Sequence, residues 1–416
     1  MKIFIKNFLK KEFHFFLVII LMFNCSETFS EEVFAANKNF NAAELSYETP
    51  EKLLIKSLVE ISQGKIDIAL ETIDSLIKQT PNFKLAYLIQ GDLLLAHTKQ
   101  INGIGDEPQV GKKEEIENLK NEAKVRIERY LNNLNLQNEP KIFAQLNEKD
   151  KYLFYVDAAN SRLYLYENKS GKLTYKDDFY ISIGKNGFGK QYEGDKKTPI
   201  GVYFTGKKIR ESLSDFYGDA AYPLSYPNEI DLKNKRNGSG IWIHGTPRTT
   251  YNRAPLASDG CVVLSNPDLN KLSSILDNNR IPVIISFQSL RDLETTNKNL
   301  AEKKLSLISA IETWRKKWAE QDTDNYLMFY SKNFFSGKDN FDSWAERKKL
   351  IQAQKAEVSI ELSEISFFDY PSTENEIVLV DFKQDYKSPT INNKMNKRQY
   401  WINENNDWRI MYEGGT

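Results

Sequence analysis

The sequence holds very few of the side chains that build disulfide frameworks or soft metal sites. Its 416 residues include two cysteines and three histidines. These are Cys25, Cys261, His14, His97 and His244. Two cysteines cannot form the several bridges of a disulfide-stapled scaffold, and a zinc site of four Cys or His ligands is hard to assemble from so few. We therefore expect no metal ion and no cofactor.

The sequence also lacks an excess of charge of either sign. It has 57 basic and 57 acidic residues, for a formal net charge of zero. A nucleic-acid-binding chain normally carries a basic excess, so the composition speaks against a nucleic-acid partner. Hydrophobic residues make up 40% and charged residues 27%, which is typical of folded protein. At about 100–200 residues per domain, the length predicts a multidomain chain.

Residues 1–30 have the layout of a secretory signal peptide. Four lysines, at positions 2, 6, 10 and 11, precede a nine-residue apolar run, Phe15–Phe23. This run is well short of the ~20 apolar residues of a membrane-spanning helix. We expect export to the periplasm or cell envelope with the leader removed; retention as a membrane anchor and lipidation of Cys25 stay open as alternatives. Removal would leave Cys261 as the one thiol of the mature chain, unpaired in an oxidising compartment.

Residues 45–139 are predicted to form an α-helical segment. Apolar residues recur at the i, i+3, i+4 spacing of buried helix faces between Pro50 and Ala96. The pattern resembles a tetratricopeptide-like helical hairpin, of which about one repeat is visible. A charged helix is expected over roughly 112–134. Because a lone repeat cannot bury its own apolar face, we expect this segment to serve in packing or dimerisation rather than in peptide binding.

Two further domains are predicted after the helices. Residues 150–288 carry aromatic and β-branched runs separated by Gly- and Pro-bearing loops, which indicates one mostly-β domain. Residues 298–416 begin with a helix over about 300–319 and continue with four strand-like segments, which indicates an α+β domain. The expected buried face of that helix consists of Leu305, Ile308, Ile311 and Trp314. The element order resembles the cone-shaped nuclear-transport-factor-like or SnoaL-like fold.

The central region pairs a single cysteine with a single histidine. A cysteine acts as a nucleophile through its thiolate, which a neighbouring imidazole can generate. His97 lies in the helical region, so elimination favours His244 as the partner of Cys261. The two residues are 17 positions apart, which a strand, a loop and a second strand can span. Gly260 lacks a Cβ and would let substrate approach the backbone closely, and backbone N–H groups near Gly260 and Cys261 could bind an oxyanion.

The motifs around this pair resemble those of the YkuD-type L,D-transpeptidase family. They are Thr198-Pro-Ile-Gly-Val-Tyr203, the glycine turn at Ile183-Gly-Lys185, His244-Gly245, and Ser258-Asp-Gly-Cys261, in the family's order. The resemblance covers 150–288 and makes this region the catalytic domain. It implies that the backbone carbonyl of Gly245 orients the imidazole of His244, and that Ser258 supports the nucleophile loop.

The sequence departs from the common family pattern at two positions. Asp259 stands where many relatives have histidine, and Val263 where many have arginine or asparagine. The resemblance implies that the polar residue replaced by Val263 helps to position the substrate or the nucleophile loop. Arg248 or Arg253, in the loop before the nucleophile, is a candidate for the substrate-carboxylate contact instead.

The resemblance implies an envelope enzyme that acts on peptidoglycan stem peptides. Cys261 would attack the carbonyl of the L-centre of the third residue, release D-Ala and form a thioester. Transfer to an amine makes an L,D-transpeptidase, which we favour; transfer to water makes an L,D-carboxypeptidase. A non-catalytic envelope scaffold is the alternative of a different class. A homodimer or an envelope protein bound through the helical or C-terminal domain stays open.

Overall fold

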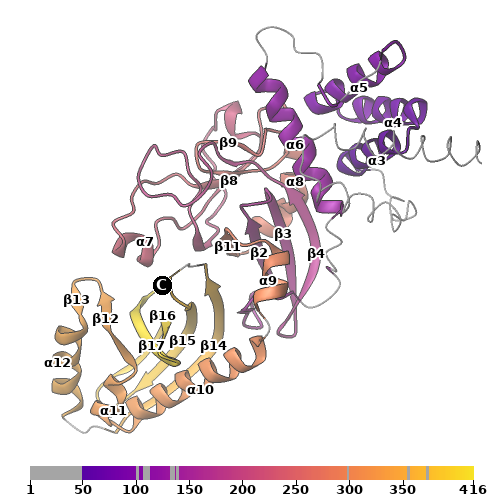
Figure 1. Ribbon diagram of the computed structural model, residues 1–416. Coiled ribbons are helices and arrows are strands. Elements are labelled where there is room, and N and C mark those ends of the chain that lie inside the picture. The colour runs from indigo at the N-terminus through magenta and orange to yellow at the C-terminus, as the bar shows by residue number, and fades with distance from the viewer. Residues whose placement is uncertain are drawn as a thin grey trace, which may run out of the picture.

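The computed structural model describes residues 49–99, 103–105, 113–131, 136, 140–297, 299–353, 357–371 and 374–416. The predicted leader, with Cys25, lies outside these residues. Figure 1 shows three parts: helices α3 to α6 at one end, a central mostly-β part, and a curved sheet with α10 to α12 at the other end. The predicted multidomain order of helices, β domain and α+β domain is confirmed, whereas the predicted domain boundaries stay predictions.

The N-terminal part begins with a helical hairpin. The helices of the N-terminal part are α3 (Pro50–Ser62), α4 (Ile66–Gln79), α5 (Lys84–Ala96) and α6 (Lys113–Leu131), of which α3 and α4 form the hairpin. Thr49 caps α3 by accepting a hydrogen bond from the Lys52 amide, and Pro50 fits the first helical turn. Helix α6 falls within the charged helix expected over roughly 112–134, and its buried residues include Glu122 and Arg126 beside Ile127, so its buried face is not purely apolar.

The central part combines a five-stranded sheet with two small sheets. The large sheet has the order β4-β3-β2-β11-β6, and the small ones have the orders β10-β8-β7 and β5-β9. The strands are β2 (Tyr152–Asp157), β3 (Arg162–Lys169), β4 (Lys172–Tyr180), β5 (Ile183–Gly184), β6 (Gly201–Phe204), β7 (Ala221–Pro223), β8 (Trp242–His244), β9 (Leu256–Ser258), β10 (Val262–Val263) and β11 (Pro282–Ser286), with helices α7 (Glu229–Lys233), α8 (Asn266–Leu276) and α9 (Leu290–Thr296). One apolar core joins the large sheet to β8, β10 and α8.

The C-terminal part is a seven-stranded sheet of order β1-β14-β15-β16-β17-β12-β13. Its elements are β1 (Ala144–Gln145), α10 (Leu300–Ala319), α11 (Thr323–Leu327), β12 (Tyr330–Ser336), β13 (Asp339–Asn340), α12 (Phe341–Gln352), β14 (Ser359–Tyr370), β15 (Ile377–Lys387), β16 (Asn392–Glu404) and β17 (Asp407–Gly415). The four strands expected after residue 356 are confirmed as β14 to β17.

The buried face of α10 differs from the predicted one. Leu305 and Ile308 are exposed, whereas Leu307, Ile311, Trp314 and Trp318 are buried. The true stripe keeps the same helical spacing but is rotated, because the indoles of Trp314 and Trp318 pack on the sheet with Tyr326. The sequence therefore predicts the helical spacing of the buried residues, but not which side of α10 faces the sheet.

The C-terminal sheet also packs against the central part. Strand β1, which precedes the large central sheet in the chain, pairs with β14. Tyr155 and Ile284 of the central sheet share an apolar cluster with Phe368 of β14 and Tyr400 of β16. The Tyr400 hydroxyl donates to a carboxylate oxygen of α7, 2.8 Å away. Within the described ranges, no helix is both long and apolar enough to cross a membrane.

Candidate active site

The register of two short strands places Cys261 and His244 on one face. Strands β8 and β10 are parallel, with Val262 opposite Ile243 and Val263 opposite His244. Val262 and Ile243 both point into the core, so alternation sends Cys261 and His244 to the opposite face. They lie diagonally across the pair, at an expected separation of about 8 Å between α-carbons. Two side chains can span that gap.

Backbone groups of the β8 strand hold the thiol. The Trp242 amide donates to Cys261 Sγ at 3.4 Å, and the thiol donates to the Gly240 carbonyl at 3.3 Å. Burial raises the pKa of Cys261 to about 11, although the Trp242 amide and the positive charge of Arg253 act in the opposite direction. Cys261 is therefore a neutral thiol at neutral pH.

The imidazole of His244 is buried and oriented by its own neighbour. Its Nδ1 lies 2.7 Å from the Gly245 carbonyl oxygen, which can only accept, so Nδ1 carries the proton and Nε2 is the basic nitrogen. Burial lowers the pKa of His244 to about 4, and the bond to Gly245 opposes that shift. The rings of Tyr217 and Phe216 pack 5.2 and 6.2 Å from the imidazole. His244 is thus neutral and able to accept a proton.

Ser258 and Thr198 fix the nucleophile loop. Ser258 Oγ donates to the Cys261 carbonyl at 2.7 Å and accepts from the Gly260 amide at 3.1 Å. Thr198 Oγ1 donates to the Gly260 carbonyl at 3.0 Å and accepts from the Gly184 amide at 2.9 Å. Because Ser258 occupies the Gly260 amide, the Cys261 amide is the better candidate for an oxyanion donor. Thr198 belongs to a family motif in the sequence, but nothing in that motif predicts its hydrogen bond to Gly260.

Gly260 is required by the chain itself. Its φ is +123°, and an added Cβ would lie 2.8 Å from the Lys197 carbonyl oxygen and 3.1 Å from Ile241 Cδ1. The sequence alone explains this glycine by the approach of substrate. The structure adds two reasons of its own: a backbone conformation that favours glycine and close packing on Lys197. Gly245 is similarly confined, because its Cβ would meet the side-chain oxygen of Asn266.

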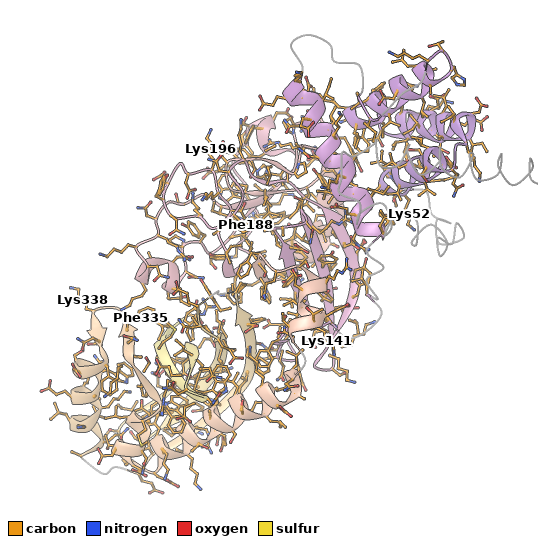
Figure 2. All side chains as sticks on the ribbon, in the orientation of Figure 1. Lys52, Lys141, Phe188, Lys196, Phe335 and Lys338 are labelled. Atoms are coloured by element: carbon orange, nitrogen blue, oxygen red, sulfur yellow. The ribbon has the colours of Figure 1, made fainter. Side chains whose placement is uncertain are left out.

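The two candidate arginines lie in different surroundings. Arg253 Nη2 donates to the Phe216 carbonyl at 2.9 Å, its Cζ lies 4.2 Å from the centre of the Phe216 ring, and its charge acts on Cys261. Arg248 is 78% exposed and approaches Asp219 at 3.9 Å. Asp259 is also exposed, 3.8 Å from the amine of Lys196, which Figure 2 labels on a loop of the central part. The structure thus places Arg253 on Phe216, beside the imidazole of His244, and Arg248 near Asp219.

The arrangement is suited to nucleophilic acyl transfer. A thiol and a neutral imidazole share a face, and a hydrogen bond to Gly245 leaves Nε2 available as the base. In this arrangement the thiol donates to the Gly240 carbonyl and not to His244. Across the described residues, no group of three or more His, Cys, Asp and Glu side chains is placed to hold a metal ion.

The high pKa of Cys261 predicts slow alkylation at neutral pH. In a Cys25→Ser background, we expect the iodoacetamide labelling rate of Cys261 to rise roughly tenfold per pH unit from about pH 7 and to level off near the pKa of about 11. Intact-mass spectrometry measures this rate. In denaturant the same thiol should titrate near its ordinary value, about 8.5. A plateau already reached at neutral pH would show a resting thiolate instead.

Comparison with known proteins assigns two of the three parts. Residues 151–285 match the L,D-transpeptidase catalytic domain model named YkuD, and residues 306–414 match the model of the Cds6 C-terminal NTF2-like domain. A search of the curated proteins finds no significant match.

Two solved structures resemble about two thirds of the chain. The helical cell shape determining protein Pgp2 from Campylobacter jejuni is 26% identical, with a TM-score of 0.56, over 67% of this chain and 96% of that one. Bd1075 from Bdellovibrio bacteriovorus is 25% identical, with a TM-score of 0.54, over 67% of this chain and 97% of that one. Residues 151–285 therefore belong to the YkuD family of L,D-transpeptidase catalytic domains, whose members act on peptidoglycan in the cell envelope, and residues 306–414 form an NTF2-like domain of the Cds6 C-terminal type.

Proposed function

We propose that the chain is a cysteine L,D-transpeptidase that cleaves stem tetrapeptides between the L-centre of the third residue and the terminal D-Ala. The observation that supports this best is the shared face of Cys261 and His244, with the His244 Nδ1 proton on the Gly245 carbonyl. That hydrogen bond gives the imidazole the tautomer of a general base without a carboxylate partner.

The reaction would proceed through two acyl transfers. His244 Nε2 takes the thiol proton as Cys261 Sγ attacks the substrate carbonyl, and the Cys261 amide is the candidate donor to the resulting oxyanion. The intermediate collapses to a thioester as D-Ala leaves with the proton held by His244. An amine of a second stem then attacks the thioester, which regenerates the thiol and forms the cross-link. Attack by water instead would make the same site an L,D-carboxypeptidase.

The products of tetrapeptide muropeptides separate these outcomes. We expect cross-linked dimers when the chain is incubated with them and the products are weighed by mass spectrometry. Tripeptide as the sole product would show that the site acts as an L,D-carboxypeptidase and not as a transpeptidase. Unchanged tetrapeptide, under conditions where Cys261 is reduced and the fold is intact, would contradict both activities. It would favour the alternative of a non-catalytic envelope scaffold.

We infer that Arg253 binds the terminal carboxylate of the donor stem. Its guanidinium lies on Phe216 next to the imidazole and acts on the Cys261 thiol, whereas Arg248 points towards Asp219. Removing a charge-assisted hydrogen bond costs about 1.5–3 kcal/mol, so Arg253→Ala should raise KM roughly 10- to 100-fold. Arg248→Ala is the matched control and should stay within about twofold of wild type. Equal effects of the two substitutions in steady-state kinetics would contradict the assignment.

We also propose that the chain works after export, in the periplasm, and that its peptidoglycan chemistry contributes to cell shape. The first point is supported by the signal-like leader and the second by the similarity to the cell shape determining protein Pgp2. A mature N-terminus found within residues 24–35 by mass spectrometry of the exported protein would support cleavage. An intact N-terminus at Met1 would favour the membrane anchor.

A further inference from the structure

The loop between the histidine and the cysteine is held by the helical part of the chain. This loop, residues 246–253, begins after His244-Gly245 and ends at Arg253. The Tyr251 amide donates to the Asn82 carbonyl at 3.1 Å, and the Asn82 side chain donates to the Arg248 carbonyl at 3.0 Å. The Tyr251 ring lies 4.7 Å from the Phe83 ring and belongs to the apolar core of the helices. The turn between α4 and α5 therefore anchors the middle of the loop.

Arg126 of α6 contacts the same loop from a second side. In the amide orientation that satisfies both of its ends, Asn252 accepts from Arg126 Nη2 and donates to the Tyr251 carbonyl at 3.2 Å. The Arg126 guanidinium also lies 3.8 Å from the centre of the Tyr180 ring. The Tyr180 hydroxyl in turn donates to the Arg253 carbonyl at 2.9 Å. One arginine of the helical part thus contacts the loop directly and also contacts the tyrosine that holds Arg253.

A buried ionic network keeps Arg126 in place. Its side chain is 3% exposed and pairs with Glu122 at 3.0 Å and with Glu51 at 3.1 Å. Glu51 also pairs with Arg162 of β3, and Arg162 with Asp178 of β4. Both carboxylate partners of Arg126 lie in the helical part, and Glu51 is in turn tied to Arg162 across the interface, which leaves the Arg126 guanidinium little freedom to turn away from Tyr180.

We propose that the helical part positions the loop 246–253 and thereby holds Arg253 on Phe216, next to the imidazole of His244, with Asn82, Arg126 and Tyr180 as positioning residues. None of the three needs to touch substrate in this arrangement. The helical segment would then take part in catalysis, beyond the packing or dimerisation expected from its sequence. The kinetic consequence rests on the proposed function, whereas the consequence for the thiol does not.

Tyr180→Phe tests the proposal because it removes one hydroxyl and little else. The matched control is Tyr175→Phe on the same strand, whose hydroxyl donates to Asp178 at 2.6 Å and serves the ionic network instead of the loop. Both variants should melt close to wild type. A loosened Arg253 should lower the iodoacetamide labelling rate of Cys261 at pH 8 by about threefold and move its pH profile upward, since an opposite charge favours the thiolate. The other charged side chains that act on Cys261, Asp259 and Lys190, are unchanged in both variants.

Steady-state kinetics supply the second readout. Tyr180→Phe should raise KM for the tetrapeptide several-fold with a smaller change in kcat, and Tyr175→Phe should change neither. Wild-type labelling and KM in Tyr180→Phe would overturn the proposal, as would equal losses in the two variants, because equal losses would indicate general loosening of the interface. If wild-type protein labels as expected but turns over no tetrapeptide, the proposed function fails, and the labelling comparison still decides whether the helices position Arg253.

Discussion

Cys261→Ala is expected to lower the turnover of stem tetrapeptides by at least about 10³-fold without unfolding the chain, because it removes the sulfur atom that would form the proposed thioester. The fold should survive because Cys261 is half-buried and its Sγ contacts the backbone at Trp242 and Gly240. Muropeptide digestion followed by mass spectrometry gives the rate, and a thermal melt gives the stability.

Cys261→Ser is the matched control for this substitution. Its hydroxyl can keep the bonds to Trp242 and Gly240 but is a far weaker nucleophile at this pH. We expect the serine variant to melt like wild type and to lose nearly as much activity as the alanine variant. Turnover within tenfold of wild type in either variant would contradict the assignment of Cys261 as the nucleophile.

His244→Asn is expected to lower kcat by roughly 10²- to 10⁴-fold, the usual contribution of a general base. An asparagine amide can still donate to the Gly245 carbonyl, as Nδ1 does, but offers no basic nitrogen at the position of Nε2. The loss should be measured as kcat at saturating tetrapeptide.

Thiol labelling separates this effect from misfolding. Because the His244 imidazole is neutral in the resting site and carries no positive charge that would favour the thiolate, its replacement should change the alkylation rate of Cys261 much less than it changes kcat. A His244→Asn enzyme with wild-type kcat would exclude the imidazole as the base. Equal losses of labelling and kcat would point to collapse of the site instead.

The fold could be predicted where apolar periodicity is strong. The hairpin of α3 and α4 and the strand pair β2–β3 follow directly from residue spacing. The phase of α10 could not be predicted, because Leu305 and Leu307 are equally apolar and only the packed indoles choose between them. The pairing of β1 with β14 joins residues more than 200 positions apart, and no local pattern indicates it.

The candidate site could be predicted because cysteine and histidine are rare in this chain. One cysteine and one histidine in the central region, each beside a glycine, leave few ways to build a nucleophile and base. What escaped prediction are the contacts that position them. Arg126 and Glu122 look like the solvent-facing side of a charged helix, since such residues are rarely buried unless paired across an interface. Thr198 reaches Gly260 across 62 positions of sequence.

The mass of the protein during turnover tests the central role of Cys261 most directly. Wild-type protein, mixed with tetrapeptide muropeptide and quenched in acid within the first turnovers, should gain the mass of the donor stem less D-Ala. Peptide mapping should place this adduct on Cys261, and prior alkylation of that thiol should abolish it. Turnover that continues with Cys261 blocked, or an adduct mapped to another residue, would contradict the assignment.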